Sequence, residues 1–222
     1  MVSSITDLEV RCSKTVFCSD LHCRAGRPCP QLRIILRIAQ LLHADCLVVA
    51  GDLFEDLHYK INYYRLLQEL RKIGLEGTQP LQIIYTPSRS SHDPKVEDVP
   101  TNLGNSTLLL ARIARIPLSR EQVVVTHGDF IITNGAIAHL FNKTAWIMGR
   151  SLFLEEITKK ELGIEKEWFI MGHTHIPGID VKRKIGNTGS WKTKWRNEIP
   201  YWRKPSRTLI FYDGKSFKML KV

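Results

Sequence analysis

Long apolar runs are absent from this sequence. Its 222 residues contain no stretch of about 18 consecutive apolar residues, so the sequence predicts no transmembrane helix. The first eleven residues include Asp7 and Glu9 and lack a continuous apolar segment, so we expect no secretory signal. Internal repeats and low-complexity segments are also absent. We therefore expect one domain over residues 1–222 in the cytoplasm, with a peripheral position at a membrane as the alternative.

Cysteine is sparse, and its spacing is not that of a zinc site. None of the five cysteines forms a Cys-x-x-Cys pair, which excludes the common structural zinc motifs. Because their number is odd, we expect reduced intracellular thiols. Cys23 and Cys29 flank a loop with Gly26 and Pro28, and a disulfide between them is the alternative. The cysteines are Cys12, Cys18, Cys23, Cys29 and Cys46.

Acidic residues are fewer than basic ones. The 32 lysines and arginines exceed the 22 aspartates and glutamates, which gives a formal net charge of +10. A basic surface favours an anionic partner, and a nucleotide, a nucleic acid and an acidic membrane all meet that description. Hydrophobic residues make up 43% of the chain and charged residues 24%, which is typical of a soluble globular enzyme.

Short apolar runs recur along the chain and predict β-strands. They are apolar throughout rather than alternating, which is typical of strands covered on both faces. Amphipathic segments at residues 30–43 and 57–73 predict helices between the first three runs. The resulting order predicts an α/β fold in which helices cover a sheet. The apolar runs span residues 15–18, 46–50, 81–85, 123–126 and 168–171.

After residue 175 the predicted strands become shorter. Asp213-Gly214 predicts a hairpin turn between the last two of them, and a second sheet packed on the first is expected. Residues 106–116 fit a helix or a strand equally well. The shorter β-like pieces are residues 179–185, 207–212 and 216–220.

Residues 134–163 have a helical pattern and many apolar side chains. One interpretation is an ordinary pair of helices that covers the core. The other is a helical lid or hydrophobic groove beside the active site, which would contact an apolar substrate or a bilayer surface. The apolar side chains include Phe141, Trp146, Ile147, Met148, Leu152 and Phe153.

Five short motifs carry the chemistry, and they use five of the eight histidines. Each places an imidazole or a carboxylate where a predicted strand ends, and the carboxyl ends of strands open onto the crevice of a sheet. Such a set can close around two divalent metal ions. The motifs are Ser19-Asp20-Leu21-His22, Gly51-Asp52, Ser91-His92-Asp93, His127-Gly128-Asp129 and Gly172-His173-Thr174-His175.

The residue types of these motifs suit a pair of transition-metal ions. Two adjacent cations repel each other, so an anion must bridge them, and Asp52 after a buried strand is the predicted bridge. Asp20 and His22 are two residues apart, so in an extended segment they share one face, and His173 and His175 have the same spacing. Mixed imidazole and carboxylate ligands favour Mn²⁺, with Fe or Zn²⁺ as alternatives, and disfavour Ca²⁺.

From Asp20 to Ser190 the motif order resembles that of calcineurin-like metallophosphoesterases, whose signature is Asp-x-His, Gly-Asp, Gly-Asn-His-Asp, His-Gly-Asp and Gly-His-x-His. The resemblance implies two facing mixed β-sheets flanked by helices. It also implies one metal held by Asp20, His22, Asp52 and His175, and a second held by Asp52, His127 and His173.

One motif departs from the family signature. Where the family has Gly-Asn-His-Asp, this chain has Ser90-Ser91-His92-Asp93, so Ser91 takes the place of the ligating asparagine. Either the loop bulges so that Ser91 or Ser90 approaches the metal, or the second site lacks that protein ligand and holds water. We expect a weaker second metal site in both cases.

The motifs also imply roles in catalysis. A metal-bridging water would attack the phosphorus, and His92 would protonate the leaving oxygen with Asp93 as its orienting partner. We expect substrate contacts at Arg89, Asn187 and Trp191. The strings around Gly51, Asn187 and Trp191 resemble the branch that contains UDP-2,3-diacylglucosamine pyrophosphohydrolases.

A basic and aromatic segment follows the last motif. Between Lys182 and Arg207 nine basic residues stand against Glu198 alone, with three tryptophans and a tyrosine interleaved. This pattern fits a site for polyphosphate, single-stranded nucleic acid or an anionic headgroup, and it equally fits a solvated hairpin with tryptophans in the core.

The sequence thus predicts a dimetal hydrolase of phosphodiester or pyrophosphate bonds, acting on an anionic, nucleotide-linked phosphate ester. The alternatives are a DNA or RNA nuclease, and a scaffold of the same fold that has lost metal ligands and binds proteins.

Overall fold

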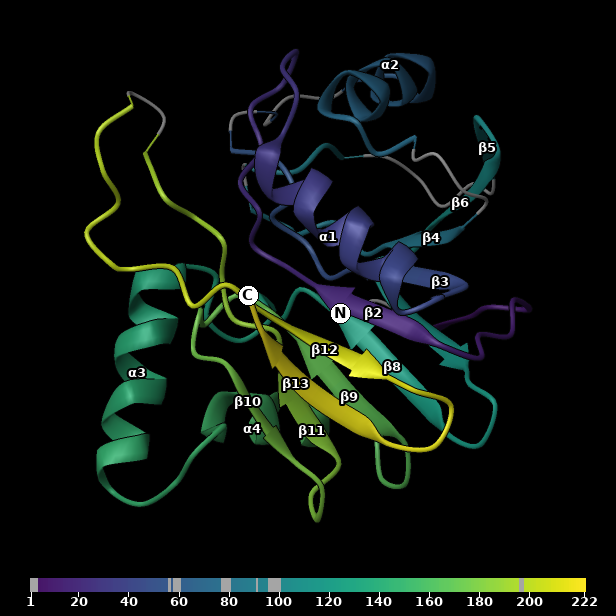
Figure 1. Cartoon of the computed structure of the whole chain (residues 1–222). Coiled ribbons are helices and arrows are strands. Elements are labelled where there is room, and N and C mark those ends of the chain that lie inside the picture. Colours follow the sequence, from purple (N-terminus) through teal and green to yellow (C-terminus); the bar gives the residue numbers. More distant parts are fainter. Residues whose placement is uncertain are drawn as a thin grey trace.

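The computed structural model describes residues 4–55, 57, 61–76, 81–90, 92–95, 101–195 and 198–222. These residues form four helices and thirteen strands arranged in two sheets. Figure 1 shows the two sheets facing each other, with α1 and α2 on one side and α3 and α4 beside the other sheet. The predicted fold class, two facing mixed sheets flanked by helices, is confirmed.

The first sheet has seven strands in the order β13-β12-β2-β3-β4-β6-β5. Its central strands β2, β3, β4 and β6 are parallel, and the strands toward each edge are antiparallel. The strands are β2 (Thr15–Cys18), β3 (Cys46–Val49), β4 (Gln82–Tyr85), β5 (Thr101–Leu103), β6 (Ser106–Leu110), β12 (Thr208–Tyr212) and β13 (Phe217–Lys221).

The second sheet has six strands in the order β1-β7-β8-β9-β11-β10. Strands β8 and β9 are parallel, and so are β9 and β11, which places their carboxyl ends together. The ambiguous segment 106–116 is not a helix but two strands, β6 and β7, which belong to different sheets. The strands are β1 (Thr6–Asp7), β7 (Ile113–Pro117), β8 (Gln122–Thr126), β9 (Trp168–Met171), β10 (Gly178–Asp180) and β11 (Ile185–Asn187).

Two crossover helices cover the outer face of the first sheet. Helix α1 (Pro30–Leu41) begins at a proline, whose fixed φ suits the first helical turn, and buries Leu32 and Ile35. Helix α2 (Tyr63–Ile73) begins where the Asn62 side chain accepts a hydrogen bond from the Arg65 N–H at 2.9 Å. It ends at Gly74 in the left-handed conformation, φ 91°.

Successive side chains along the strands point alternately into two hydrophobic layers. Along β3, Leu47 and Val49 pack with α1 and α2, whereas Val48 points into the layer between the sheets. In that inner layer the Trp168 ring lies against the Phe217 ring, with centroids 4.2 Å apart. Strands buried on both faces explain why the sequence shows continuous apolar runs rather than alternation.

Helices α3 (Gly135–Ile147) and α4 (Phe153–Glu161) occupy the predicted helical segment 134–163. Helix α4 covers the second sheet through contacts with β9 and β11, and α3 packs on α4. The buried Asn142 amide joins them, since its oxygen accepts from the Leu154 N–H at 2.9 Å and its nitrogen donates to Glu155 at 2.8 Å. In the part of the chain that the structure describes, no helix is long and apolar enough to cross a bilayer.

The expectation of reduced thiols is wrong for four of the five cysteines. Disulfides join Cys12 to Cys46 and Cys23 to Cys29, and only Cys18 keeps a buried free thiol. The first pair is long-range, with Cα atoms 5.8 Å apart, and depends on how the segment before β2 lies against β3. The second pair is the Cys23–Cys29 disulfide that was expected as the alternative, across the loop with Gly26 and Pro28.

Candidate metal centre

The predicted ligands meet where strands of both sheets end. Asp20 follows β2 and Asp52 follows β3 in the first sheet, and His127 and His173 follow β8 and β9 in the second. The backbone ties these ends together, because the Asp20 N–H donates to the Gly51 carbonyl at 3.1 Å and the Gly172 N–H to the His127 carbonyl at 3.1 Å. The site therefore forms where the strand ends of the two facing sheets meet.

Most of the predicted ligands have an unusual backbone conformation. Ten described non-glycine residues have positive φ, and five of them are predicted metal ligands. A side chain with Cβ seldom adopts this left-handed region, and such strain concentrates at functional sites. The chain thus turns sharply after each strand and directs the side chain inward. The five are Asp20 (53°), His22 (51°), Asp52 (47°), His173 (67°) and His175 (58°).

Two glycines of the motifs are required by close approach. Gly51 has φ +75°, and a Cβ there would lie 2.5 Å from the His127 ring. A Cβ on Gly172 would collide with the side chains of Ser19 and Asp20. Both glycines therefore let one ligand-bearing loop pack against another, which explains Gly-Asp and Gly-His in the motifs.

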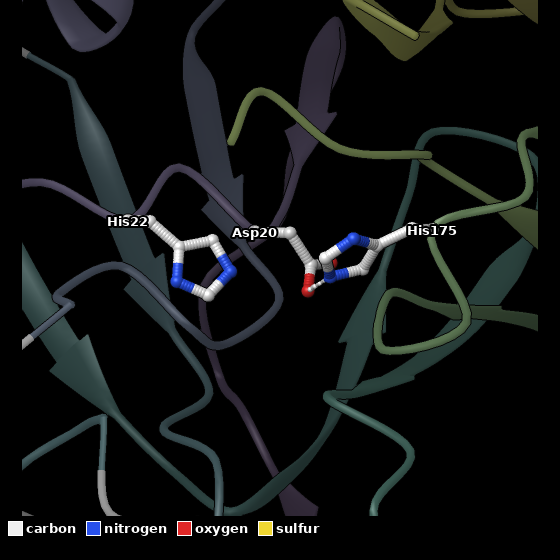
Figure 2. A group of neighbouring side chains, drawn as sticks. All are labelled: Asp20, His22 and His175. Atoms are coloured by element: carbon white, nitrogen blue, oxygen red, sulfur yellow. Dashed lines mark ion pairs between the residues drawn. The ribbon is translucent and has the colours of Figure 1, made fainter. Parts of the chain in front are cut away.

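One group of candidate ligands contains Asp20, His22 and His175, shown in Figure 2. Each offers a ligand atom within 4.8 Å of the others. His175 Nε2 lies 2.8 Å from Asp20 Oδ1, and the other Asp20 oxygen accepts from the His173 N–H at 3.0 Å. His22 Nε2 is buried and has no hydrogen-bond partner among the residues that the structure describes. A buried imidazole nitrogen whose lone pair has no partner in the protein is suited to bind a cation.

A second group contains Asp20, Asp52 and His127, all buried. His127 Nδ1 lies 3.0 Å from the Ala50 carbonyl, so this nitrogen carries the proton and Nε2 presents its lone pair to the centre. His127 Nε2 lies 3.5 Å from Asp52 Oδ1 and 3.2 Å from His173 Nδ1. The His127 Nε2 atom thus lies close to one candidate ligand atom of Asp52 and one of His173.

The Asp52 carboxylate faces both groups. Its Oδ1 lies 3.5 Å from His127 Nε2, and its Oδ2 lies 3.8 Å from His22 Nε2. Each oxygen is therefore directed to a different imidazole. This is the arrangement expected of a carboxylate that bridges two cations.

Electrostatics keep the carboxylates ionised. Burial alone would raise the pKa of Asp20, but His175 and His127 together outweigh burial and lower the pKa to about 2. Burial also acts on Asp52, and His127 and His22 overcome it and lower the pKa of Asp52 far below its usual range. Burial would lower the pKa of His127, yet Asp52 and Asp20 raise it to about 10. Two buried carboxylates thus favour positive charge at this position, which either a proton on His127 Nε2 or a cation bound there in its place would supply.

Asp93 does not orient His92, contrary to the prediction. Its buried carboxylate accepts hydrogen bonds from the N–H groups of Asp52 at 2.8 Å and Ser88 at 2.8 Å. It thereby fixes the turn that carries the Asp52 carboxylate. His92 Nδ1 lies instead 2.9 Å from the Glu55 carbonyl, which orients the ring. The two rings of His92 and His22 have centroids 5.0 Å apart.

Ser91 lies outside the described residues, so its predicted role as a ligand stays a prediction. Its neighbour Ser90 donates a hydrogen bond to Asp52 Oδ1 at 3.0 Å. Asp129 accepts from the N–H groups of Arg89 at 2.6 Å and Ser90 at 3.0 Å, and so holds this loop against the centre. The His-Gly-Asp motif therefore supplies a ligand and a loop anchor.

Glu55 and Lys192 were missed by the sequence analysis. His22 Nδ1 lies 2.6 Å from Glu55 Oε2, and Lys192 Nζ lies 2.8 Å from the same oxygen. Both side chains are buried. Glu55 also forms a candidate ligand group with His22 and His92. The available signal was the position of Glu55 shortly after Gly51-Asp52, whereas Lys192 gave no signal apart from its basic neighbours.

Two of the three predicted substrate contacts are interior residues. Asn187 is fully buried, and its amide nitrogen donates to the Gly172 carbonyl at 2.6 Å and to Glu155 at 2.8 Å. Trp191 is a core residue whose Nε1 donates to the Thr208 carbonyl at 3.0 Å. Both side chains stabilise the loops around the centre. Trp191 also lines the cavity beside His22, so its contact with substrate stays a prediction. Arg89 is exposed, and its guanidinium lies 5.2 Å from the Phe130 ring centroid.

Helix α3 adjoins the centre and has an exposed apolar face. His139 Nδ1 lies 2.8 Å from the Thr174 carbonyl, between the two histidines of the last motif. On the outer side Leu140, Ile147 and Met148 are 65%, 72% and 75% exposed. The inner side of α3 packs on α4, which covers the second sheet as one interpretation required. The lid or bilayer contact of the other interpretation stays a prediction.

No protein-family model matches the sequence, and no curated protein sequence matches it. Solved structures with a similar fold include an archaeal phosphodiesterase (12% identity, TM-score 0.47, 94% of this chain and 99% of that chain). A Vps29 of Entamoeba histolytica complexed with zinc has 13% identity and a TM-score of 0.46 over 94% of this chain and 98% of its own. YfcE, a phosphoesterase from E. coli, has 16% identity and a TM-score of 0.42 over 89% of this chain and 87% of its own.

Two of these similar structures are named as a phosphodiesterase and a phosphoesterase. The finer resemblance to UDP-2,3-diacylglucosamine pyrophosphohydrolases stays a prediction.

Proposed function

We propose that the protein is a metal-dependent phosphoesterase that hydrolyses phosphodiester or pyrophosphate bonds with two divalent cations. The observation that carries the proposal is the Asp52 carboxylate, which directs one oxygen to His22 and the other to His127. The donors fit such ions, because the centre offers imidazole nitrogens and ionised carboxylates together.

The proposed ligand sets are those that the family resemblance implies, and the proximity of these side chains supports them. Asp20, His22, Asp52 and His175 would hold one cation, and His127 and His173 would hold the other with Asp52 shared. Bound cations would acidify a water molecule and neutralise the phosphoryl oxygens. Mn²⁺ is the proposed metal, with Fe or Zn²⁺ as alternatives.

His22 is held by the protein in the tautomer that a metal ligand needs. Its Nδ1–H donates to Glu55, which leaves the Nε2 lone pair for the centre. The Lys192 ammonium compensates the charge of the Glu55 carboxylate, and the Lys192 side chain is buried. Glu55 is thus a positioning residue for His22.

His92 is the proposed proton donor to the leaving oxygen. Its Nδ1–H donates to the Glu55 carbonyl, so the opposite nitrogen of the imidazolium is free to donate to substrate. A positively charged side chain beside the centre, Arg89, is the proposed contact for the phosphoryl group or the leaving group.

The scaffold alternative requires the loss of metal ligands. Six predicted ligands converge in the described part of the chain, so the geometry favours an enzyme. The six are Asp20, His22, Asp52, His127, His173 and His175.

The proposal is tested with metal-depleted protein and bis(p-nitrophenyl) phosphate, with and without added Mn²⁺. We expect hydrolysis that depends on the metal and is lost in Asp52→Asn. The control is Glu161→Gln, an exposed carboxylate at the end of α4, which should hydrolyse as the wild type does. Metal-independent hydrolysis, or full activity of Asp52→Asn, would refute the proposal.

A further inference from the structure

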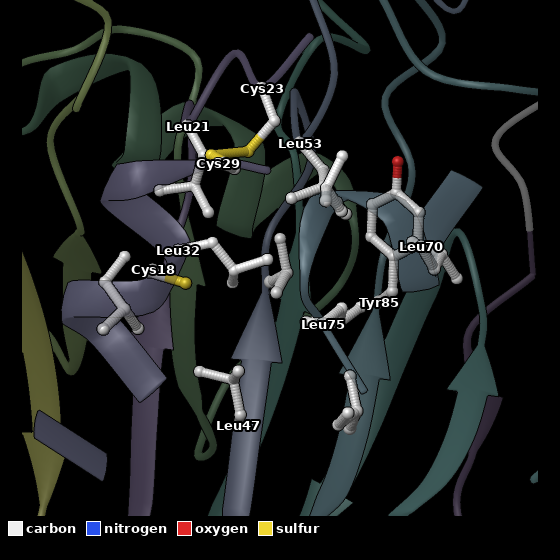
Figure 3. Packing of buried hydrophobic residues seen from close by; sticks show 14 of the residues in the cluster. Cys18, Leu21, Cys23, Cys29, Leu32, Leu47, Leu53, Leu70, Leu75 and Tyr85 are labelled. Atoms are coloured by element: carbon white, nitrogen blue, oxygen red, sulfur yellow. A yellow bond between two sulfur atoms is a disulfide. The ribbon is translucent and has the colours of Figure 1, made fainter. Parts of the chain in front are cut away.

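Two cavities adjoin each other on the α1 side of the metal centre. The first, of about 490 Å³, is lined in part by His22 and Glu55 of the centre. The second, of about 550 Å³, lies between α1 and α2. Pro28 and Cys29 line both cavities, so the loop closed by the Cys23–Cys29 disulfide separates them. Figure 3 shows this disulfide packed on the hydrophobic core, which gives the shared wall a fixed base.

Basic side chains dominate the charge of both cavities. Four line the first and three line the second. The three acidic side chains there are already in ion pairs with basic neighbours. The guanidinium groups of Arg33, Arg37 and Arg207 have no hydrogen-bond or ion-pair partner within the described residues. We call the seven residues the basic track: Arg24, Arg27, Arg33, Arg37, Arg71, Lys194 and Arg207.

An aromatic ring lies at the end of the basic track near the metal centre. Trp195 lines the first cavity, and 42% of the residue is exposed. The Lys192 ammonium lies 4.6 Å from its ring centroid and helps to fix the ring. An exposed ring beside a basic groove is a platform on which an unpaired base can stack.

We propose that the basic track binds the backbone of a single-stranded nucleic acid and leads one phosphodiester of that strand to the metal centre. The inference rests on the proposed phosphoesterase function. In the reaction, a water oxygen bonds to phosphorus while the bond from phosphorus to the leaving oxygen breaks. One water proton ends on the leaving oxygen, and the other stays with the new phosphomonoester or passes to solvent.

The extent of the basic track distinguishes this ligand from smaller anions. A nucleoside diphosphate would occupy the first cavity and leave Arg33, Arg37 and Arg71 without a ligand. A strand with regularly spaced phosphates reaches both cavities and neutralises the whole track. Stacking on Trp195 requires an unpaired base, which favours a single strand over a duplex.

The test compares two double variants with equal charge change. Arg33→Glu/Arg37→Glu alters the basic track, and Arg120→Glu/Lys166→Glu alters a separate cavity on another face. Each Mn²⁺-loaded protein is assayed on a fluorescein-labelled 12-nucleotide DNA strand and on bis(p-nitrophenyl) phosphate over a range of salt concentrations.

We expect the track variant to lose about tenfold in kcat/KM on the DNA strand and to reduce the salt slope by about two, one for each phosphate contact. Its kcat/KM on bis(p-nitrophenyl) phosphate should not change, and the control pair should behave as the wild type on both substrates. Equal loss on both substrates, or loss of the same size in the control pair, would overturn the inference.

Failure of the proposed function gives a different pattern. If the Mn²⁺-loaded wild type hydrolyses neither substrate, the phosphoesterase proposal fails. Fluorescence anisotropy of the labelled strand with metal-free protein then decides the inference by itself. About tenfold weaker binding by the track variant than by the control pair supports the track, and equal binding overturns it. Competition by ADP as strong as by the unlabelled strand would also overturn it.

Discussion

The two flanks of the metal centre differ in chemistry although they adjoin the same ligands. The α1 flank presents the basic track and two cavities. The α3 flank presents apolar side chains, among them Leu140 and Ile147 at 65% and 72% exposure. One side therefore suits a polyanion and the other an apolar contact. With the proposed function, substrate preference would be set by the surroundings of the candidate ligands, because these ligands would recognise only a phosphate ester.

The two flanks are also connected to the centre in different ways. On the α1 flank, Cys23 follows His22 directly, and its disulfide holds the loop between the cavities. On the α3 flank, His139 and Asn142 form hydrogen bonds with Thr174 of the last motif. Substitutions on one flank should therefore alter one class of substrate, whereas substitutions in the centre should alter all of them.

The largest effect is expected in the centre. Asp20→Asn removes a carboxylate shared by two candidate ligand groups. Activity on the DNA strand and on bis(p-nitrophenyl) phosphate should fall by about a thousandfold, equivalent to about 4 kcal/mol of transition-state stabilisation. The measurement is kcat/KM on both substrates at saturating Mn²⁺. Loss of activity on only one of the two substrates would contradict this, because it would show that Asp20 serves recognition of that substrate and not the shared centre.

Glu55→Gln should have the next largest effect. The amide cannot hold His22 Nδ1–H as the carboxylate does, and loss of such an orienting partner costs about 10-fold to 100-fold in metal affinity or activity. Calorimetric titration with Mn²⁺ measures the affinity, and Glu161→Gln is the matched control. An unchanged affinity for Mn²⁺ would show that Glu55 does not position His22.

Asn142→Ala tests how α3 is attached. Without the amide, the buried Leu154 N–H and the Glu155 carboxylate lose a partner, which costs about 1–3 kcal/mol in the free energy of unfolding. Urea denaturation measures this. Thr144→Ala on the exposed side of α3 serves as the control and should stay within about 0.5 kcal/mol of the wild type. Equal stability of the two variants would contradict the assigned contact.

Trp195→Ala tests whether an aromatic ring on the α1 flank contributes to binding of the strand. Loss of a stacking platform should weaken binding of the DNA strand by about tenfold, while hydrolysis of bis(p-nitrophenyl) phosphate stays the same. Anisotropy with the labelled strand measures the binding. Trp146→Ala, which removes an exposed tryptophan of α3, is the matched control and should bind as the wild type does.

The smallest effect is expected from Ile147→Ser on the α3 flank. This side chain is exposed, so stability should change by less than about 0.5 kcal/mol and DNA hydrolysis should not change. Thermal unfolding and the DNA assay measure the two quantities. A clear drop in DNA hydrolysis would show that the flanks are not independent.

The sequence predicted those parts of the fold and centre that depend on short segments. Residues 15–18, 46–50 and 123–126 were predicted as strands because strands buried on both faces give continuous apolar runs. The ligands were predicted because Asp52 and His127 directly follow such runs. As expected, Asp52 and His127 lie close together in the structure.

Parts that depend on distant partners were not predictable. Glu55 and Lys192 are 137 residues apart, and nothing in either segment announces their ion pair. Asp93 was assigned to its neighbour His92, whereas its partners are backbone groups, among them the Asp52 N–H of another loop. Asn187 was assigned to substrate because its string resembled a family motif, and burial decides otherwise.

The most direct test of the account is the number of Mn²⁺ ions bound by metal-depleted protein, measured by equilibrium titration beside Asp52→Asn. The account predicts two ions per wild-type chain, the second bound more weakly, and loss of affinity for both ions in the variant because one carboxylate contacts both. Binding of no ion by the wild type, or the same two affinities in Asp52→Asn, would contradict it.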